Sequence, residues 1–176
     1  ADMLPEDGYR QKLLKGPDEY DKYMLLRDSG YHHQNMRNML QLNLGNSTSN
    51  IPQFSEIGQL AGVSNTDWSW CPLFVDLDND GWKDLFITNG YLRDYTNLDF
   101  LKYTFEDFKK SAARAGHTFD TMALVKQMPS TALNNYCFRN NTNLTFNNVS
   151  AAWGLDEKAI SSGAAYADLD NDGDQD

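Results

Sequence analysis

Two nine-residue stretches carry the side chains of this sequence that are best suited to chemistry. Both have the pattern D-x-D-x-D-G-x-x-D, with carboxylates at positions 1, 3, 5 and 9. The first stretch contributes Asp76, Asp78, Asp80 and Asp84, and the second contributes Asp168, Asp170, Asp172 and Asp176. Carboxylates at this spacing repel one another unless a hard cation lies between them, and a dense set of oxygen ligands suits Ca²⁺. The pattern therefore predicts two calcium loops.

Positions 6 and 7 of both stretches support the same interpretation. Gly81 and Gly173 permit the sharp turn that directs the carboxylates toward one centre. We expect the residues at position 7, Trp82 and Asp174, to add a backbone carbonyl oxygen to each shell. The alternative is an ordinary turn rich in Asp, Asn and Gly that holds no metal. Repetition of the pattern in matching context favours the metal.

Short apolar segments flank the first stretch and decide which type of calcium loop is expected. Residues 73–75 precede it and residues 85–88 follow it, and both are rich in β-branched and aromatic side chains. Such runs are typical of buried strands. An EF-hand would need helices on both sides and a bidentate Glu at position 12, where this sequence has Ile87. We therefore expect the loop to connect two strands of a β-hairpin.

The two stretches belong to a longer internal repeat with an offset of 92 residues. The aligned pairs are Phe54 with Phe146, Ile57 with Val149, Gly62 with Gly154, Ser69 with Ser161 and Phe74 with Tyr166. Upstream, residues 38–43 match residues 135–140 with a few extra residues in the first copy. Repeats of short strands predict a propeller or a solenoid. The offset exceeds a propeller blade of about 40–50 residues, so we infer an insertion between residues 90 and 134.

The inserted residues have the apolar periodicity of helices. One helix is predicted from about residue 96, with Thr96 or Asn97 as its N-cap and Gly116 at its end. A second is predicted over residues 120–128, and a third over residues 18–29 near the N-terminus. We expect these amphipathic helices to pack against the sheet without a cofactor.

Composition limits the class of protein and its partners. The 176 residues are 40% hydrophobic and 12% aromatic, which indicates a globular chain with a real core. The net charge of −10 without a basic cluster argues against nucleic acid and anionic membrane surfaces as partners. No run is long enough for a transmembrane segment.

Two isolated cysteines, Cys71 and Cys137, lie in predicted strands. They could form a disulfide if those strands are neighbours. Two buried free thiols are the favoured alternative, because the chain is not a small cysteine-dense scaffold.

Residues 72–90 and 162–174 resemble FG-GAP/VCBS repeats, the calcium-binding blades of integrin-α-like β-propellers. Residues 140–155 are similar to the bacterial branch of exported proteins that carry ASPIC/UnbV-type domains. Residues 2–7 and 90–95 also resemble large exported proteins of that branch. The resemblance implies a mainly β fold with helical insertions, forming a partial β-propeller of about two blades' worth of repeats. It also implies that Asp76, Asp78, Asp80 and Asp84 are metal ligands, as are Asp168, Asp170, Asp172 and Asp176.

The same resemblance implies boundaries within the chain. Residues 1–65 would end one blade and carry a helical insertion. Residues 66–150 would form a complete blade with the first calcium loop and a helical insertion at 96–129. Residues 151–176 would start a further blade and stop at the second calcium loop. Within a blade, the calcium loop joins the first two strands, and the Asn-rich segment supplies the third and fourth.

The expected function is non-enzymatic: a calcium-binding repeat segment that serves as a scaffold or as an interaction or adhesion module. The resemblance implies export to the cell surface, outer membrane or extracellular space, with a cell-surface protein or glycan as partner. One alternative is a module that binds glycan or another cell-surface polymer through aromatic loops around Trp68, Trp70, Tyr91 and Tyr95. A polysaccharide-acting enzyme is the weaker alternative, and its candidate polar residues are Arg93, Asp94 and Asp99.

Overall fold

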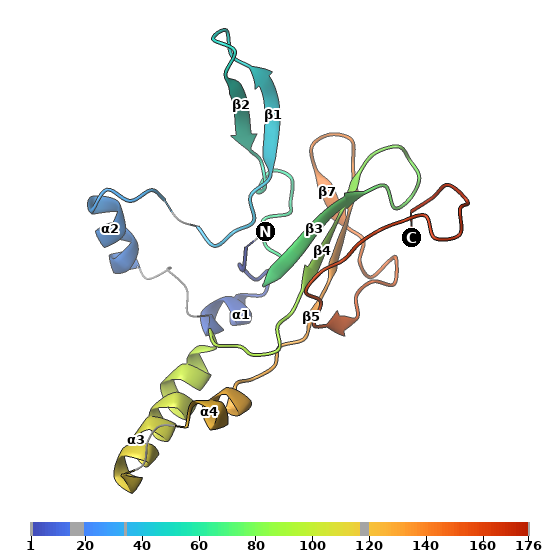
Figure 1. Ribbon diagram of the computed structural model, residues 1–176. Coiled ribbons are helices and arrows are strands. Elements are labelled where there is room, and N and C mark those ends of the chain that lie inside the picture. The colour runs from blue at the N-terminus through green and yellow to red at the C-terminus, as the bar shows by residue number, and fades with distance from the viewer. Residues whose placement is uncertain (1, 15–19, 34, 117–119, 176) are drawn as a thin grey trace. The chain divides into compact units, whose positions relative to one another are not determined.

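The computed structural model describes residues 2–14, 20–33, 35–116 and 120–175 (Figure 1). The chain divides into two compact units. The first comprises Ala1–Glu6, Arg37–Gly90 and Ala132–Asp176, and the second comprises Asp7–Met36 and Tyr91–Thr131. All described strands belong to the first unit and all described helices to the second. The expectation of a mainly β fold with helical insertions is confirmed at this level, and the described strands form no closed barrel.

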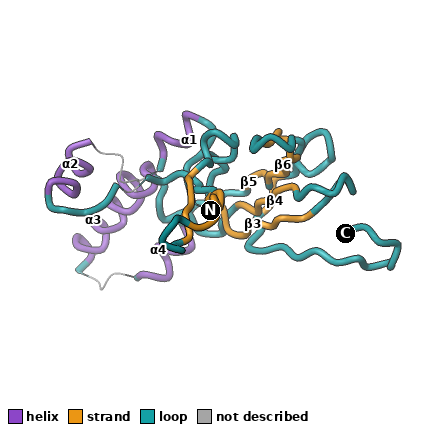
Figure 2. The backbone as a smooth tube through the Cα atoms, turned by 90° about the horizontal axis from the view of Figure 1, so that it is seen from above, coloured by secondary structure: helices purple, strands orange, loops and turns teal. Residues whose placement is uncertain are grey.

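The first unit is built around a four-stranded antiparallel sheet. Its strands are β3 (Ser69–Val75), β4 (Asp84–Asn89), β6 (Tyr136–Asn140) and β7 (Phe146–Asn148), in the order β3-β4-β6-β7. Figure 2 shows β3, β4 and β6 side by side. The first stretch of carboxylates connects β3 to β4, and the Asn-rich segment supplies β6 and β7. The predicted hairpin and the predicted order of the four strands are both confirmed.

The two strands of this hairpin differ in burial. Strand β4 is almost wholly buried, and β3 and β6 pair with its two edges. Strand β3 alternates instead: Val75 is buried, whereas Phe74 is 42% exposed. The prediction that both flanking segments are buried strands was therefore wrong for β3, because one of its faces has no covering layer among the described residues.

Two further pairs of strands belong to the first unit. The hairpin of β1 (Gln41–Asn46) and β2 (Pro52–Glu56) forms one two-stranded sheet. Strands β5 (Leu133–Asn134) and β8 (Lys158–Ala159) form the other. Strand β8 was not expected, because two residues are too short a segment to produce a periodic pattern in the sequence.

The β1–β2 hairpin and the β6–β7 hairpin are paired in the same register. Asn43 lies opposite Phe54 in the first, and Asn140 lies opposite Phe146 in the second. These four residues occupy equivalent positions of the internal repeat. The aligned stretches of sequence therefore adopt the same strand pairing.

The turns that follow the two hairpins also form matching hydrogen bonds. Ile57 N donates to Leu40 O, and Val149 N donates to Cys137 O, both at 2.8 Å. Within the same turns, Val63 N donates to Gly58 O (3.0 Å) and Leu155 N donates to Ser150 O (2.7 Å), and these two hydrogen bonds are again equivalent. The repeat thus extends from the hairpins into the segments that lead to the next strand.

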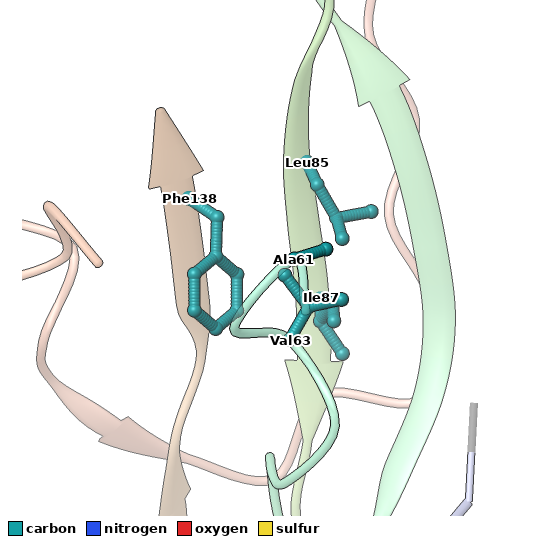
Figure 3. Close-up of a cluster of buried hydrophobic side chains, with 5 residues drawn as sticks. All are labelled: Ala61, Val63, Leu85, Ile87 and Phe138. Atoms are coloured by element: carbon teal, nitrogen blue, oxygen red, sulfur yellow. The ribbon is translucent and has the colours of Figure 1, made fainter. Parts of the chain in front are cut away.

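A compact hydrophobic cluster lies on one face of the four-stranded sheet. Figure 3 shows its members, which are Ala61, Val63, Leu85, Ile87 and Phe138. Burying an aliphatic or aromatic side chain stabilises a fold by about 1.5–3 kcal/mol. Because Leu85 directly follows Asp84, this cluster fixes the start of β4 and therefore the last carboxylate of the first stretch.

The second unit contains α1 (Gly8–Leu13), α2 (Tyr20–Asp28), the π-helix η1 (Phe100–Phe105), α3 (Glu106–Ala115) and α4 (Thr121–Gln127). The three predicted helices are confirmed as α2, as η1 with α3, and as α4, although Asp18, at the predicted start of the first, lies outside the described residues. Asn97 makes a capping hydrogen bond at the start of the second of these, since its Oδ1 accepts from Phe100 N at 3.0 Å. Gly116 ends α3 in the left-handed conformation, with a φ of 64°. Helix α1 was missed because only six residues and one cap, Asp7, define it.

The cysteines are both free. Strand β4 lies between β3, which contains Cys71, and β6, which contains Cys137. The condition for a disulfide, that the two strands be neighbours, is therefore not met. Cys137 is buried, and burial raises the pKa of its thiol to about 12, whereas Cys71 is only partly buried.

None of the described helices is both long enough and apolar enough to cross a bilayer.

Candidate metal sites

The loop between β3 and β4 gathers three of its four carboxylates. Asp76, Asp78 and Asp84 each contribute one oxygen atom, and these oxygens lie within 4.8 Å of one another. Asp76 follows the last residue of β3, and Asp84 is the first residue of β4. The two ends of the hairpin loop are thus held together by strand pairing. Such a group of oxygens could hold a metal ion.

The backbone of this loop wraps around the carboxylate of Asp76. Asp76 Oδ1 accepts from Asp80 N at 3.2 Å, and Asp76 Oδ2 accepts from Gly81 N at 2.9 Å. Asn79 and Gly81 adopt positive φ values of 57° and 86°. The predicted need for glycine at position 6 is confirmed, because this φ strains residues with a Cβ.

Asp84 is the most constrained carboxylate of the loop. Its side chain is fully buried. Its Oδ1 accepts from Asn140 N at 2.9 Å, and its Oδ2 accepts from Leu77 N at 3.2 Å. Burial raises the pKa of Asp84, and the negative charges of Asp78 and Asp80 act in the same direction, whereas the two hydrogen bonds oppose them. A bound cation would offset both the burial and the repulsion.

Arg139, on β6, contacts the outer side of the same loop. Its Nε lies 2.6 Å from Asp78 Oδ2, and its Nη2 lies 3.4 Å from Asp80 Oδ2. The guanidinium therefore partly neutralises two of the carboxylates. The other oxygen of Asp78, Oδ1, is buried and has no hydrogen-bond partner among the described residues. An orphaned buried carboxylate oxygen within a group of carboxylates fits a metal ligand.

The second stretch repeats the loop conformation of the first. Asp168 Oδ1 accepts from Asp172 N at 3.1 Å, and Asp168 Oδ2 accepts from Gly173 N at 3.0 Å. Asn171 and Gly173 again have positive φ, at 64° and 100°. Here the oxygens of Asp168, Asp170 and Asp172 lie within 4.8 Å of one another, and all three residues are exposed. The predicted ligand Asp176 lies outside the described residues.

Position 5 differs between the two loops. Asp172 belongs to the second group of carboxylates, whereas Asp80 is not among the three gathered in the first. Asp80 Oδ1 instead accepts from Trp82 N at 2.8 Å, and its Oδ2 faces Arg139. Asp172 Oδ1 accepts from Asp174 N at 3.1 Å, and this hydrogen bond is the main reason that the pKa of Asp172 is lowered.

The residues at position 7 were predicted to supply carbonyl oxygens. The structure assigns hydrogen bonds to the backbone N–H of Trp82 and of Asp174, and the Trp82 side chain is exposed. The carbonyl role of both residues stays a prediction. What the geometry supplies is a set of carboxylate oxygens, which suits a hard cation and does not by itself select one.

Arg139 and Asn140 also belong to the first site, and neither was predicted from the sequence. Both lie more than fifty residues after the loop, on β6, and reach it only because β6 pairs with β4. No spacing rule connects them to the carboxylates. A signal exists only for Asn140, which belongs to the Asn-rich segment that the repeat places next to this hairpin.

The aromatic residues proposed to line a glycan site do not share one environment. In the first unit, Trp68 is buried and Trp70 is 47% exposed, with ring centroids 6.0 Å apart. In the second unit, Tyr91 is buried and Tyr95 is exposed. Trp70 Nε1 donates to Gly90 O at 2.6 Å, which holds the exposed ring against the end of β4. Two of the four residues are therefore parts of the interior.

The polar residues considered for catalysis are also separated by burial. Asp94 is fully buried; its Oδ2 accepts from Tyr91 Oη at 2.8 Å, and its Oδ1 accepts from Thr96 N at 3.0 Å. Arg93 and Asp99 are exposed. These contacts give Asp94 a structural role in the loop that follows β4.

No protein family model, curated protein or solved structure matches this chain.

Proposed function

We propose that this chain is a non-enzymatic calcium-binding repeat segment of a β-propeller, and that it acts as a scaffold or interaction module. The observation that carries the proposal is the repetition of one loop conformation at two sites. In each loop the first Asp accepts hydrogen bonds from positions 5 and 6, and three carboxylate oxygens lie within 4.8 Å of one another. An ordinary turn would have no reason to retain four carboxylates in both copies.

Calcium is favoured over other cations by the chemistry of the ligands. The gathered atoms are carboxylate oxygens, and no His or Cys contributes to either group. Oxygen ligands suit Ca²⁺ and Mg²⁺, and the flexible geometry of a short loop suits the larger ion better than the strict octahedron of Mg²⁺. The first site would use Asp76, Asp78 and Asp84, and a water or carbonyl oxygen would complete the shell.

A propeller is favoured by the strand order and by the repeat. Four antiparallel strands in sequential order are typical of a propeller blade. The β1–β2 hairpin has the register of β6–β7, as the last two strands of a neighbouring blade would. Extracellular calcium modules bind with Kd values of about 10⁻⁴–10⁻³ M, so a protein of this kind would be loaded outside the cytosol. We therefore propose an exported protein with a cell-surface protein or glycan as partner.

Isothermal titration calorimetry with Ca²⁺ on the chelator-stripped chain tests this function. We expect saturable binding of calcium, a weak response to magnesium, and loss of one site in Asp78→Ala. The matched control is Asn79→Gly, which changes the same loop without removing a carboxylate and tolerates the positive φ of this position. A folded protein that gives no calcium-dependent heat would contradict the proposal.

A further inference from the structure

The outer edge of β1 carries backbone groups that face away from β2. Leu40 O accepts from Ile57 N at 2.8 Å, so Leu40 faces the β2 side. In an antiparallel pair, successive residues direct their N–H and C=O groups to opposite edges. The backbone groups of Met39 and Gln41 therefore face the other edge, where the described residues supply no strand.

The equivalent edge in the second copy of the repeat is covered. Met39, Leu40 and Gln41 correspond to Tyr136, Cys137 and Phe138 of β6. Those three residues pair with Ile87, Phe86 and Leu85 of β4. The same surface thus occurs twice in this chain, once with a strand on it and once without.

The N-terminal residues show where a covering strand would run. Asp2 N donates to Asn38 Oδ1 at 2.6 Å, as Asn89 N donates to the equivalent Asn135 Oδ1 at 2.9 Å. Asp2 O accepts from Ser69 N at 3.2 Å. In the same way, Asn89 O accepts from the equivalent Ser161 N at 2.9 Å. Asp2 therefore makes the contacts that the last residue of β4 makes in its own repeat.

We propose that the edge of β1 is a docking site for a β-strand of the β4 type, supplied by a further copy of this repeat. The strand runs antiparallel to β1, and its residues equivalent to Leu85, Phe86 and Ile87 lie opposite Gln41, Leu40 and Met39. Backbone hydrogen bonds to Met39 and Gln41 provide the attraction, as in other cases of strand addition. Two apolar side chains of the docked strand, equivalent to Leu85 and Ile87, extend the hydrophobic face.

The proposal explains the apolar surface around this edge. Met39 is 61% exposed, and Phe74 faces the same cavity as Met39 and Leu40. An exposed edge strand with apolar neighbours is prone to pair with another strand. A docked strand with the sequence pattern of β4 would cover the apolar side chains near Met39. Its polar first residue, equivalent to Asp84, would lie at the end of the strand that follows the carboxylate loop.

Hydrogen–deuterium exchange on an extended chain tests the proposal. The sequence Lys-Asp-Leu-Phe-Ile-Thr, taken from residues 83–88, is joined directly before Asp2 in place of Ala1. We expect the amides of Met39 and Gln41 to exchange at least about tenfold more slowly than in the original chain. The amide of Leu42, which already faces β2, serves as an internal reference and should change little.

The matched control carries the same extension with Ile replaced by Pro. Proline removes the N–H that would face Met39, so the protection should be lost. Equal exchange of Met39 and Gln41 in both extended chains and in the original chain would overturn the proposal. All three are measured with a chelator present, so the result does not depend on whether the loops bind calcium.

Discussion

The two carboxylate loops of this protein share a sequence pattern and a backbone conformation, yet they differ in what surrounds them. Asp76 and Asp168 accept equivalent hydrogen bonds from equivalent residues. The first loop is closed by two paired strands, has a fully buried carboxylate in Asp84, and is contacted by Arg139. The gathered carboxylates of the second loop are all exposed.

This difference separates two contributions to a metal site. The turn that directs the first carboxylates inward is local, since it forms in both loops. In the first loop, the sheet supplies the carboxylate at position 9 and the neutralising side chain, because Asp84 lies on β4 and Arg139 lies on β6. We therefore expect the first loop to bind calcium more tightly than the second.

Replacement of Asp84 by Ala should have the largest effect. It removes a metal ligand and leaves the N–H groups of Asn140 and Leu77 without their acceptor. We expect the free energy of unfolding in calcium to fall by about 2–4 kcal/mol, as estimated for unsatisfied buried donors together with lost binding. Chemical denaturation with and without calcium measures this change.

The variant for comparison in the second loop is Asp172→Ala, because Asp176, which is equivalent to Asp84, lies outside the described residues. Asp172 is exposed, so its removal should reduce calcium binding at that loop with little change in stability without calcium. Equal destabilisation by the two variants in chelator would contradict the idea that the sheet supports Asp84 more strongly than Asp172 is supported.

Replacement of the first carboxylate in each loop should separate the two binding events. Asp76→Asn should abolish the tighter calcium transition, and Asp168→Asn should abolish the weaker one. We expect the two dissociation constants to differ by about tenfold, which corresponds to about 1.4 kcal/mol. Calorimetric titration of the two variants checks this, and loss of the same transition in both would show that the loops do not bind independently.

The pH dependence of the calcium-free protein should follow Asp84. Its pKa is raised in the folded protein, so its contribution to stability is fully present below the pKa of the unfolded chain. That contribution is lost as the pH rises through the higher pKa of the folded state. The Asp84→Asn variant should lack this loss.

Urea denaturation in chelator, repeated across acidic to neutral pH, measures the difference between the two chains. As the pH rises, the original chain should lose stability relative to the Asn variant. For calcium binding the direction is opposite, since protons compete with the metal. The first loop should therefore lose calcium at a higher pH than the second, where the pKa of Asp172 is lowered.

Replacement of Arg139 by Gln should have the smallest effect. The Arg139 side chain is 49% exposed, so solvent weakens its ion pairs with Asp78 and Asp80. We expect a small decrease in the melting temperature without calcium, and a smaller decrease with calcium, because a bound cation takes over the neutralisation. Lys83→Gln removes a charge from the same loop and is the control; an identical change in both variants would make the effect nonspecific.

Much of the local structure follows from short-range patterns in the sequence. The hairpin around the first loop, the glycine turns, and the helices ended by Gly116 or capped by Asp120 depend on residues within one or two turns of each other. The β5–β8 pair escaped prediction, because Leu133 and Asn134 meet Lys158 and Ala159 only through the tertiary fold. The exposure of Phe74 escaped it for the same reason, since a short apolar run does not reveal whether a second layer covers it.

The sequence alone predicts the type and spacing of the carboxylates, the turn that gathers them, and the repeat that produces two such loops. Backbone conformation and charge repulsion act over a few residues, so these features can be read from neighbours in the chain. The burial of Asp84, its hydrogen bond from Asn140 and the ion pair between Arg139 and Asp78 follow only from the tertiary structure. Burial and long-range pairing depend on which strands lie side by side, and no local pattern contains that information.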